Sequence, residues 1–410
     1  MQVRICSEVE RLRSVIVHSP GAEVDVMVPS MMEKLLFDDI LFRDIAGAEH
    51  AGFRAALECF VDDVFDVQDL LAATLGTEDV RRRFVDGLLR VTHIDPSLRE
   101  ELVAMESAAL AAAVIEGRVA VDGPDLYRIA PVPNLLFMRD PAMVVGERVQ
   151  ISSMARASRA REAFILGHLF AESGAAQHRA PAVEGAAMGG APTLEGGDVL
   201  VPSATTAMVG LSERTNPAGA DRLARALAAE GKFENLILVH LPHDRYTMHL
   251  DTVFTFIDRD QALIYPPFFE PGSGQIRCGR IELTSAVAER GIPAYHANLE
   301  IFDALAQSGL DLEPVPIGGH RLVDQMREQW TDGCNAFCVE PGRFFLYQRN
   351  FHTLETLASR GYRVISAAHF VARSDYYKNE CGRMVITLDD SELSRARGGP
   401  RCMSMPLRRD

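Results

Sequence analysis

The spacing of apolar and polar residues repeats along this chain: strand-like alternation is followed by helical spacing, and this order recurs several times. In the clearest copy, alternating positions at 253–257 and 262–265 predict two strands joined by a turn at 258–261. Helical spacing near 281–290 and a short run near 293–298 then predict a helix and a closing strand. The pattern therefore predicts a repeating unit of strand, turn, strand, helix and strand.

A second clear copy lies toward the end of the chain, with strands at 336–339 and 344–347, a helix near 352–360 that Gly361 ends, and a strand at 362–366. Three further copies are less regular. Their elements are predicted at 14–18, 35–41, 48–60 and 64–67, at 142–145, 149–152 and 159–173, and at 199–202, 206–210, 217–231 and 235–241.

Residues 68–123 interrupt this pattern. The segment is rich in Ala, Leu, Glu and Arg, and its apolar residues recur at helical spacing. We interpret it as a small inserted helical domain, with 1–67 as the first unit and 124–410 as the other units of one catalytic domain. The expected fold class is α/β. Five units can close into a ring, which removes exposed sheet edges, and an ordinary open sheet is the alternative.

Composition narrows the class of protein. The chain has 410 residues, 47% of them hydrophobic, and no apolar run long enough to predict a membrane span. A net charge of −15 argues against a nucleic-acid or anionic-membrane partner. The seven cysteines form no disulfide pattern, and the first residues lack the apolar core of a signal peptide, so we expect a cytoplasmic protein.

One cysteine stands out near the C-terminus. In the segment 398–407, a glycine-containing loop leads Cys402 into a strand-like alternation. Arg395, Arg397 and Arg401 surround it in sequence, and neighbouring cations lower the pKa of a thiol from about 8.5, which favours the reactive thiolate. A packed core thiol is the alternative, because buried cysteines are common in cytosolic proteins.

Polar residues elsewhere supply possible partners for a reactive thiol. His249 and Asp251 are two residues apart, so in a strand their side chains lie on the same side. Glu195 and Asp198 enclose a Gly-Gly pair, where the backbone can turn sharply. Asp140 precedes Pro141, and a residue before proline favours extended backbone. Taken singly, each is more often part of a turn or a surface ion pair. No spacing of His and Cys predicts a metal site.

Together these groups have a chemical logic. Carboxylates that share a site raise one another's pKa, and a cationic ligand relieves their repulsion. A planar guanidinium suits them because it forms paired hydrogen bonds with carboxylates. Its central carbon can then be attacked by a thiolate, while His249 can protonate departing ammonia and later activate water.

The order of these motifs resembles that of the arginine deiminases, a family of the guanidino-group-modifying (pentein) superfamily. The resemblance covers nearly the whole chain and rests on residues 7–21, 35–41, 137–141, 194–199, 212–215, 249–254 and 398–407. Met138 and Cys334 depart from the residues that are usual in the family at those positions.

The resemblance implies a five-fold α/β propeller with a helical insertion after the first blade. It also implies hydrolysis of L-arginine to L-citrulline and ammonia through a covalent thiouronium-type intermediate. Cys402 would be the nucleophile and His249 the general acid and base. Asp140 and Asp251 would hold the guanidinium, and Glu195 would assist His249 or the substrate.

The resemblance further implies how the amino-acid end of the substrate is held. The expected substrate-binding residues are Asn134, Phe137, the main chain near Leu36, Arg159, Arg214 and Arg397; the three arginines would bind the substrate carboxylate or order a lid. Arg156 and Arg161 remain open as alternatives to Arg159. No cofactor or metal is expected, and the family implies a homo-oligomer, either a dimer or a tetramer.

Two other functions fit part of the pattern. An amidinotransferase, or a deiminase for a modified guanidine, keeps the cysteine, histidine and carboxylates, but a transferase must exclude water and admit an amine acceptor. A non-catalytic arginine-binding protein would keep the carboxylates and lose the nucleophile or the base, and both are present here. The sequence therefore favours hydrolysis of arginine.

Overall fold

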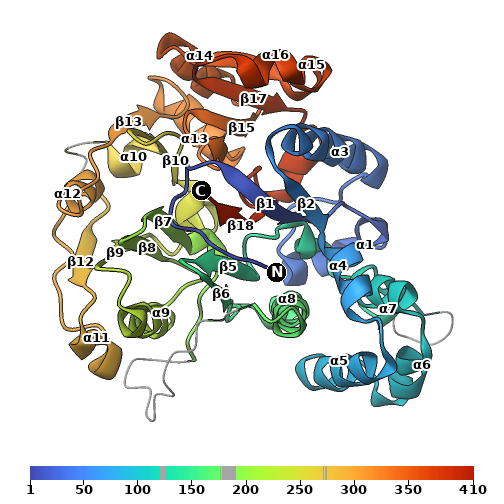
Figure 1. Cartoon of the computed structure of the whole chain (residues 1–410). Helices are drawn as coiled ribbons and strands as arrows, with labels where there is room; N and C mark the ends of the chain where they lie inside the picture. Colours follow the sequence, from blue (N-terminus) through green and yellow to red (C-terminus); the bar gives the residue numbers. More distant parts are fainter. Residues whose placement is uncertain (121–125, 176, 178–190, 271, 273–274) are drawn as a thin grey trace.

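The computed structural model describes residues 1–120, 126–175, 177, 191–270, 272 and 275–410, which form an α/β fold. Short sheets lie around the middle of the molecule. Helices such as α3 (Arg43–Phe60), α9 (Pro217–Glu230) and α14 (Phe351–Ser359) lie toward its outside (Figure 1). Within the described residues, every helix is too short or too polar to cross a bilayer.

The two ends of the chain meet in one sheet. Strand β1 (Leu12–Val17) pairs antiparallel with β18 (Met405–Arg409) and parallel with β2 (Asp63–Asp66). Because Cys402 lies just before β18, this pairing fixes the segment that bears the thiol against the first strand of the chain.

The remaining strands of the described residues form two two-stranded sheets, one of which is a hairpin, and three larger sheets. The hairpin consists of β5 (Ala142–Val145) and β6 (Arg148–Ile151). The larger sheets contain β7 (Val199–Ser203), β8 (Thr206–Leu211), β9 (Asn235–His240) and β12 (Cys278–Glu282); β10 (Phe254–Phe256), β11 (Gln261–Ile264) and β13 (Glu313–Pro316); and β14 (Phe337–Glu340), β15 (Arg343–Tyr347), β17 (Met384–Leu388) and β16 (Arg363–Ser366).

Each larger sheet repeats one connection. An antiparallel pair is followed, after at least one helix, by a strand that pairs in parallel: β8 with β9, β11 with β13, and β15 with β17. The helices on this route include α9, α12 (Ile301–Ala306) and α14, as well as the shorter α10 (Pro266–Phe269), α11 (Ser285–Arg290), α15 (Ala367–Ala372) and α16 (Ser374–Asn379). The recurrence agrees with the repeating unit expected from the sequence.

Two predicted strands are absent from the described residues. Leu35 ends the helix α2 (Met32–Leu35), and Leu36 has a left-handed backbone with φ of 64°, so 35–41 is not a strand. Residues 293–298 form no strand either, and the strand that joins β11 is β13. Leu35 and Phe37 are buried at a helix end and in a loop, whereas residues 293–298 form a largely exposed loop. Local alternation does not distinguish either case from a strand.

The pairing of distant segments corrects two further predictions. The helix expected from residue 281 begins at Ser285, because Cys278–Glu282 pairs with β9 as an edge strand. Strand β17, which the sequence did not indicate, lies between β15 and β16. These assignments depend on partners far along the chain.

Helices occupy most of the segment that was predicted to be an insertion. They are α4 (Val67–Thr74), α5 (Glu78–Val91), α6 (Arg99–Ala104) and α7 (Ser107–Ile115), and they lie together on one side of the molecule (Figure 1). A two-stranded ribbon, β3 (Arg118–Val119) and β4 (Tyr127–Ile129), follows. The predicted boundary at 123/124 lies outside the described residues.

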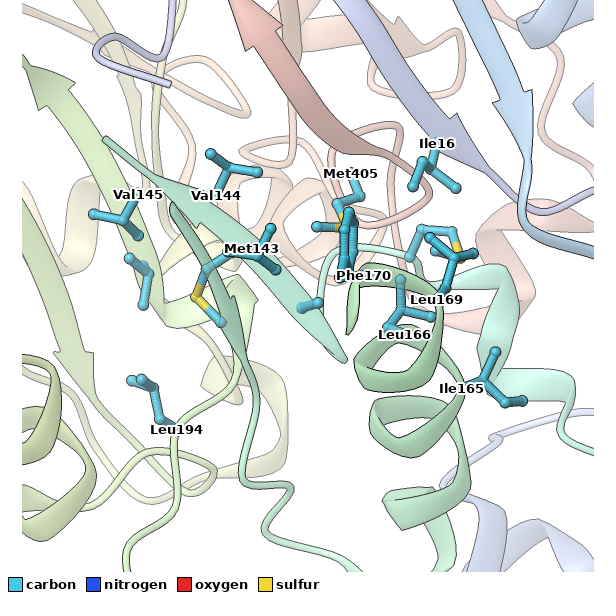
Figure 2. Packing of buried hydrophobic residues seen from close by; sticks show 14 of the residues in the cluster. Ile16, Met143, Val144, Val145, Ile165, Leu166, Leu169, Phe170, Leu194 and Met405 are labelled. Atoms are coloured by element: carbon cyan, nitrogen blue, oxygen red, sulfur yellow. The ribbon is translucent and has the colours of Figure 1, made fainter. Parts of the chain in front are cut away.

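Buried apolar side chains join this helical segment to the sheets, because Leu71 of α4 and Phe84 of α5 belong to the same cluster as α8 (Ala160–Glu172) and the strands. Leu169 and Phe170 of α8 share this cluster with Met143 of β5, Ile16 of β1 and Met405 of β18 (Figure 2). Burying such a side chain fully contributes about 1.5–3 kcal/mol relative to an exposed one. The cluster therefore helps to hold β18, and with it the Cys402 segment, in place.

The side chain of Asn216, at the N-terminus of α9, joins this helix to the segment before β7. The Oδ1 of Asn216 accepts hydrogen bonds from the main-chain N–H of Gly219 at 2.9 Å and of Thr193 at 3.1 Å. We expect Asn216→Ala to lower the free energy of unfolding by about 1–2 kcal/mol, because both N–H groups lose their acceptor. Urea unfolding followed by circular dichroism measures the change. Asn216→Asp keeps the acceptor but loses the 2.8 Å hydrogen bond from Nδ2 to the carbonyl of Ala191, so it should cost less than alanine. An alanine variant as stable as the wild type would contradict this role.

Candidate active site

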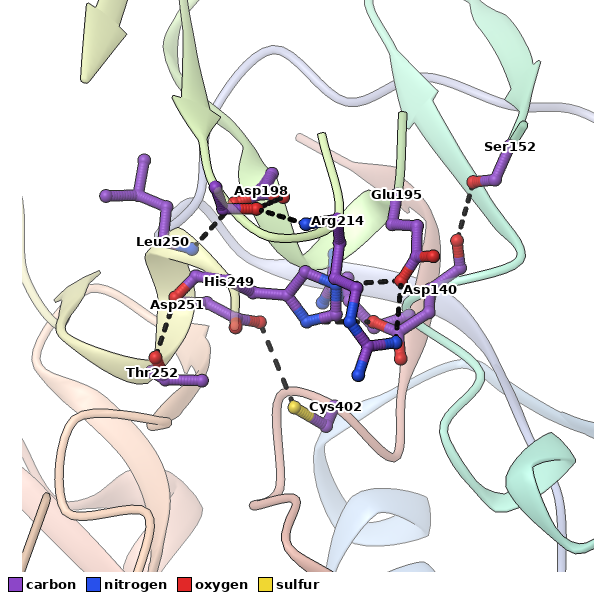
Figure 3. Close-up of polar contacts among 12 residues, drawn as sticks. Asp140, Ser152, Glu195, Asp198, Arg214, His249, Leu250, Asp251, Thr252 and Cys402 are labelled. Atoms are coloured by element: carbon purple, nitrogen blue, oxygen red, sulfur yellow. Dashed lines mark hydrogen bonds and ion pairs between the residues drawn. The ribbon is translucent and has the colours of Figure 1, made fainter. Parts of the chain in front are cut away.

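Cys402 lies in a turn before β18, with 5% of its surface exposed. Its main-chain N–H donates a 2.9 Å hydrogen bond to Oδ1 of Asn335, and Nδ2 of Asn335 donates to the carbonyl of Asp251 at 3.2 Å. The Cys402 Sγ lies 4.0 Å from Oδ2 of Asp251 (Figure 3). Asn335 therefore links the segment of the thiol to that of the carboxylate. The thiol is buried, as the core alternative required, but it faces polar groups.

His249 forms a second buried pair with Glu195. The His249 Nε2 lies 2.9 Å from Oε2 of Glu195, and Nδ1 lies 3.7 Å from Oδ1 of Asp140. Burial disfavours the imidazolium, but Asp140 and the hydrogen bond to Glu195 outweigh it and raise the pKa of His249 to about 9. Burial also opposes ionisation of Glu195, yet His249 and two nearby arginines lower its pKa to about 2. At neutral pH this pair is an imidazolium beside a carboxylate.

The prediction that 249–251 lie in a strand is wrong. His249 has extended backbone, but Leu250–Thr252 form a short 3-10 helix, and β10 begins only at Phe254. Asp198 stabilises this turn, because its Oδ1 accepts the N–H of Leu250 at 2.9 Å while its Oδ2 accepts the Ser212 hydroxyl at 2.7 Å. A distant carboxylate thus decides the local conformation, which the sequence spacing does not reveal.

The Gly-Gly pair between Glu195 and Asp198 makes room for the imidazole. A Cβ added to Gly197 would lie 2.7 Å from Cγ of His249, which is closer than a non-bonded contact allows. The four-residue segment therefore surrounds His249 from one side: Glu195 binds its ring and Asp198 fixes the turn that follows it.

Asp140 and Asp251 each bind an arginine of the protein through one carboxylate oxygen only. Each uses Oδ2 to bind an arginine of the protein: Asp140 binds Nη1 of Arg159 at 2.7 Å, and Asp251 binds Nη1 of Arg401 at 2.7 Å. The Oδ1 of both is buried and has no hydrogen-bond partner. Burial raises the pKa of Asp251 even though Arg401 opposes this shift. An unpaired buried carboxylate oxygen costs free energy, so each aspartate offers one acceptor to a cationic ligand.

The prediction of a lowered pKa for Cys402 is wrong, although Arg401 does act in that direction. Burial, together with the carboxylates of Asp251 and Asp140, raises the pKa of the thiol well above its usual value. The Arg395 guanidinium forms ion pairs of 2.6 Å with two other carboxylates, and Arg401 is already paired with Asp251. In the absence of a ligand the thiol is therefore held neutral.

Of the three arginines considered around residue 159, Arg159 lies beside Asp140 and Glu195. Its guanidinium pairs with Asp140 and lies 3.9 Å from Glu195. Arg156 instead pairs with Glu213 near the surface, and Arg161 donates to main-chain carbonyl groups next to the helical segment. The position of Arg159 beside Asp140 places it nearer the expected guanidinium end than the expected carboxylate end of a substrate.

The residues expected at the amino-acid end of a substrate come from three segments. Nδ2 of Asn134 donates to the carbonyl of Leu35 at 2.5 Å, next to the left-handed Leu36. The ring of Phe137 fills the space beside Gly398, where an added Cβ would lie 2.3 Å from it. The Phe137 contact therefore packs the 134–137 segment against the loop that leads to Cys402.

Arg214 and Arg397 both carry buried N–H groups without a hydrogen-bond partner. The Arg214 Nη1 lies 4.0 Å from Oε2 of Glu195, and its Nε has no hydrogen bond. The Arg397 backbone is left-handed, with φ of 65°, and its guanidinium lies 3.3 Å from the ring centre of Trp330 on α13 (Leu322–Trp330). Its Nε and Nη1 are buried and unpaired, as a group that awaits an anionic ligand would be.

Sequence reasoning missed the positioning residues of this site. Asn335 and Arg401 stand within or beside segments already noted, and Asp198 belongs to the Gly-Gly motif, but their contacts are with side chains from other units. The adjacency of Arg401 to Cys402 was a signal of proximity, yet it indicated the wrong partner, because the guanidinium reaches Asp251 instead of the thiol.

Asp140, Glu195 and His249 offer ligand atoms within 4.8 Å of one another, a spacing that can hold a metal ion. A metal ligand must be a neutral imidazole, whereas the pKa of His249 is raised to about 9. A metal ion that bound here would therefore have to displace the proton of His249.

An α/β fold with a buried thiol, an imidazolium–carboxylate pair and half-paired aspartates defines a cysteine-dependent site for a cationic ligand. The model of the arginine deiminase family matches residues 33–122 and 116–409. The chain belongs to the arginine deiminase family.

Relatives extend over the whole chain. The arginine deiminase of Levilactobacillus brevis is 32% identical and covers 100% of this chain and 98% of its own length. The arginine deiminase of Mycoplasma capricolum is 29% identical with the same coverage. Among solved structures, SxtG, an amidinotransferase from Microseira wollei, gives a TM-score of 0.54 at 15% identity over 99% of this chain and 97% of its own. The N-terminal domain of ArgZ, an arginine dihydrolase from cyanobacteria, gives 0.51 at 15% identity over 96% and 97%. These structures support the α/β fold alone.

The pKa of His249 should depend on Glu195. We expect Glu195→Gln to lower that pKa from about 9, because the amide removes a charge that favours the imidazolium. NMR titration of labelled histidine rings, assigned with His249→Asn, measures the shift. Glu58→Gln, which changes an exposed carboxylate, is the control. An unchanged titration in Glu195→Gln would contradict the pairing.

The same pair links folding to pH. The folded pKa of His249 lies above its unfolded value of 6.5, so its contribution to stability is complete below that pH and is lost as pH rises through about 9. The folded pKa of Glu195 lies below its unfolded value of 4.5, so its contribution is present above that pH and is lost as pH falls through about 2.

The reactivity of the thiol should depend on Asp251. We expect Asp251→Asn to lower the pKa of Cys402, since a negative charge 4.0 Å from Sγ is removed and Arg401 loses its partner. The rate of Cys402 alkylation by iodoacetamide, followed against pH by peptide mass spectrometry, reports this pKa. The exposed Cys381 serves as an internal control. A pH profile that stays the same or moves upward would show that Asp251 does not hold the thiol neutral.

Proposed function

We propose that this protein hydrolyses L-arginine to L-citrulline and ammonia. The observation that carries the proposal is that two buried oxygens beside Cys402 and His249, Oδ1 of Asp140 and Oδ1 of Asp251, have no hydrogen-bond partner. A guanidinium is planar and offers N–H groups on several edges, so it can donate to both oxygens at once. Membership of the arginine deiminase family supports the same substrate.

In this proposal, binding of the substrate converts the Cys402 thiol to the reactive thiolate. Because the guanidinium remains protonated at any physiological pH, its binding adds a positive charge next to two carboxylates that raise the pKa of Cys402. That charge offsets the effect of Asp140 and Asp251, lowers the pKa of the thiol and favours the thiolate. The enzyme thereby forms its reactive sulfur only where substrate is present.

The covalent steps follow from the groups around the sulfur. The Cys402 thiolate attacks the guanidinium carbon and forms a C–S bond. The imidazolium of His249 gives its proton to one nitrogen, the C–N bond breaks, and ammonia departs to leave a thiouronium. The neutral His249 then takes a proton from water, whose oxygen attacks the same carbon. The C–S bond breaks, the thiolate returns, and the remaining proton on the oxygen passes to solvent as citrulline forms.

The remaining substrate-binding roles are proposed because these residues match positions of the family's motifs and because of the contacts that their side chains make. Arg214 and Arg397 each carry a buried N–H group without a hydrogen-bond partner and so suit the substrate carboxylate. Asn134 and the main chain near Leu36 would contact the amino-acid end, with Phe137 beside them. Arg159 belongs to the same site, where it holds Asp140 and so acts on the guanidinium end.

We also propose the finer architecture on the family relationship. The recurring hairpin and parallel strand suit five units around a pseudo-five-fold axis. Residues 1–67 and 124–410 would then form one catalytic domain, with 68–123 as a helical insertion. A homodimer or homotetramer is proposed on the same relationship.

Turnover of arginine tests the function. We expect purified protein to release citrulline and ammonia in equal amounts from arginine. Cys402→Ala should reduce this rate by at least about 10³-fold, because the covalent step needs the sulfur. Colorimetric citrulline detection measures the rate, and intact mass after acid quenching should detect a covalent adduct on Cys402.

Two outcomes would favour the rival functions. An amidinotransferase would form ornithine and would need an amine acceptor such as glycine. An arginine-binding protein would bind arginine equally in the wild type and in Cys402→Ala, with no citrulline from either. Equal citrulline production by Cys402→Ala and wild type would remove the proposed nucleophile.

A further inference from the structure

Trp330 is the single tryptophan of the chain and ends helix α13. One part of its ring lies under the guanidinium of Arg397, at 3.3 Å from the carbon to the ring centre. Trp330 is 44% exposed, whereas Arg397 is only 9% exposed. The exposed part of Trp330 lines a groove of about 870 Å³, which Phe351 also lines. The indole therefore separates Arg397 from the solvent in this groove.

Arg397 differs from the other arginines near the thiol. Arg395 and Arg401 each bind two carboxylates, so their charges are already used. Arg397 instead rests on an aromatic face, which attracts a guanidinium but offers no acceptor for its N–H groups. Its Nε and Nη1 remain buried and without a hydrogen-bond partner. Because Nε and Nη1 lie on different edges of the guanidinium, a carboxylate that approaches either edge finds an N–H group free to donate.

The backbone conformation of Arg397 makes the orientation of its guanidinium depend on the contact with the Trp330 ring. Arg397 has a positive φ of 65°, which is unfavourable for a residue with a side chain. Its guanidinium has no hydrogen bond within the described residues to set its orientation. The contact with Trp330 is thus the main interaction that fixes the plane of the guanidinium, and a planar donor must be oriented to bind a carboxylate through two hydrogen bonds.

We propose that Trp330 is a positioning residue that orients Arg397 to bind the carboxylate of the substrate, so that the site selects guanidines with a terminal carboxylate. This inference rests on the proposed function and refines its substrate class. Agmatine, which is arginine without the carboxylate, cannot use the oriented Arg397. Loss of the stack should therefore weaken the binding of arginine and leave that of agmatine unchanged.

Calorimetry in a Cys402→Ala background provides the test, because it measures binding without turnover. Adding Trp330→Leu should raise the Kd for arginine by about 3- to 30-fold, the range expected for loss of a buried cation–π contact. The Kd for agmatine should change less than twofold. Trp330→Phe keeps an aromatic face and should restore most of the affinity for arginine. Arg397→Lys keeps the charge but loses the planar stack and should resemble Trp330→Leu.

Phe351→Leu is the matched control, since Phe351 lines the same groove and packs against His352. It should leave both dissociation constants unchanged. In the enzyme with Cys402 intact, Trp330→Leu should raise the KM for arginine while kcat stays within about twofold. Such a split indicates loss of binding that the ground state and the transition state share.

Three results would overturn the inference: an equal weakening of arginine and agmatine, an unchanged Kd for arginine in Trp330→Leu, or no recovery in Trp330→Phe. If Trp330→Leu does not fold, the comparison of Trp330→Phe with Arg397→Lys decides, and equal affinities for arginine in those two variants would refute the stack. Failure of the proposed function is recognised separately, because wild type would then make no citrulline even if the calorimetric differences were present.

Discussion

Carboxylates buried around the Cys402 sulfur determine the protonation state of the neighbouring groups. Asp140 and Asp251 lie close enough to raise the pKa of the thiol, and Asp140 with Glu195 raises that of His249. In a low-dielectric interior such interactions are much stronger than in water. The free protein therefore keeps the thiol neutral and the imidazole charged. Only a ligand that brings positive charge can change this balance, which makes the site selective for cations before any shape is considered.

The protein supplies part of that positive charge itself. Arg159 takes one oxygen of Asp140 and Arg401 takes one oxygen of Asp251, so each carboxylate is oriented and half neutralised. If both oxygens were paired, no acceptor would remain for a substrate. If neither were paired, burial would favour protonation of the carboxylates. The observed half-pairing keeps the aspartates in place and still leaves a buried acceptor on each.

The fold brings these groups together through contacts between distant segments. The first and last strands pair, which fixes the Cys402 turn, and Asn335 joins that turn to Asp251. Asp198 performs the same task for the segment after His249. Related scaffolds support transfer as well as hydrolysis, as the likeness to an amidinotransferase illustrates. Function on such a scaffold is decided by the groups in the site and by the access of water, and the fold alone does not decide it.

The sequence by itself determined the elements whose signal is local. The strand pairs at β10 and β11 and at β14 and β15 follow from alternation and turn residues, and the helices of the 67–115 segment follow from their period. The candidate groups Cys402, His249 and Glu195 could also be named, because their motifs occur in a recognisable order.

Tertiary structure decided what depends on distant partners. The pKa of Cys402 was expected to fall because of its sequence neighbours, yet it rises, since the adjacent Arg401 turns to Asp251 and the nearest charges in space are carboxylates. The turn after His249, the edge strand β12 and the stack of Arg397 on Trp330 are likewise set by residues far along the chain. Sequence spacing records the order of side chains, whereas charge interactions and packing depend on distances in space, and those exist only once the chain has folded.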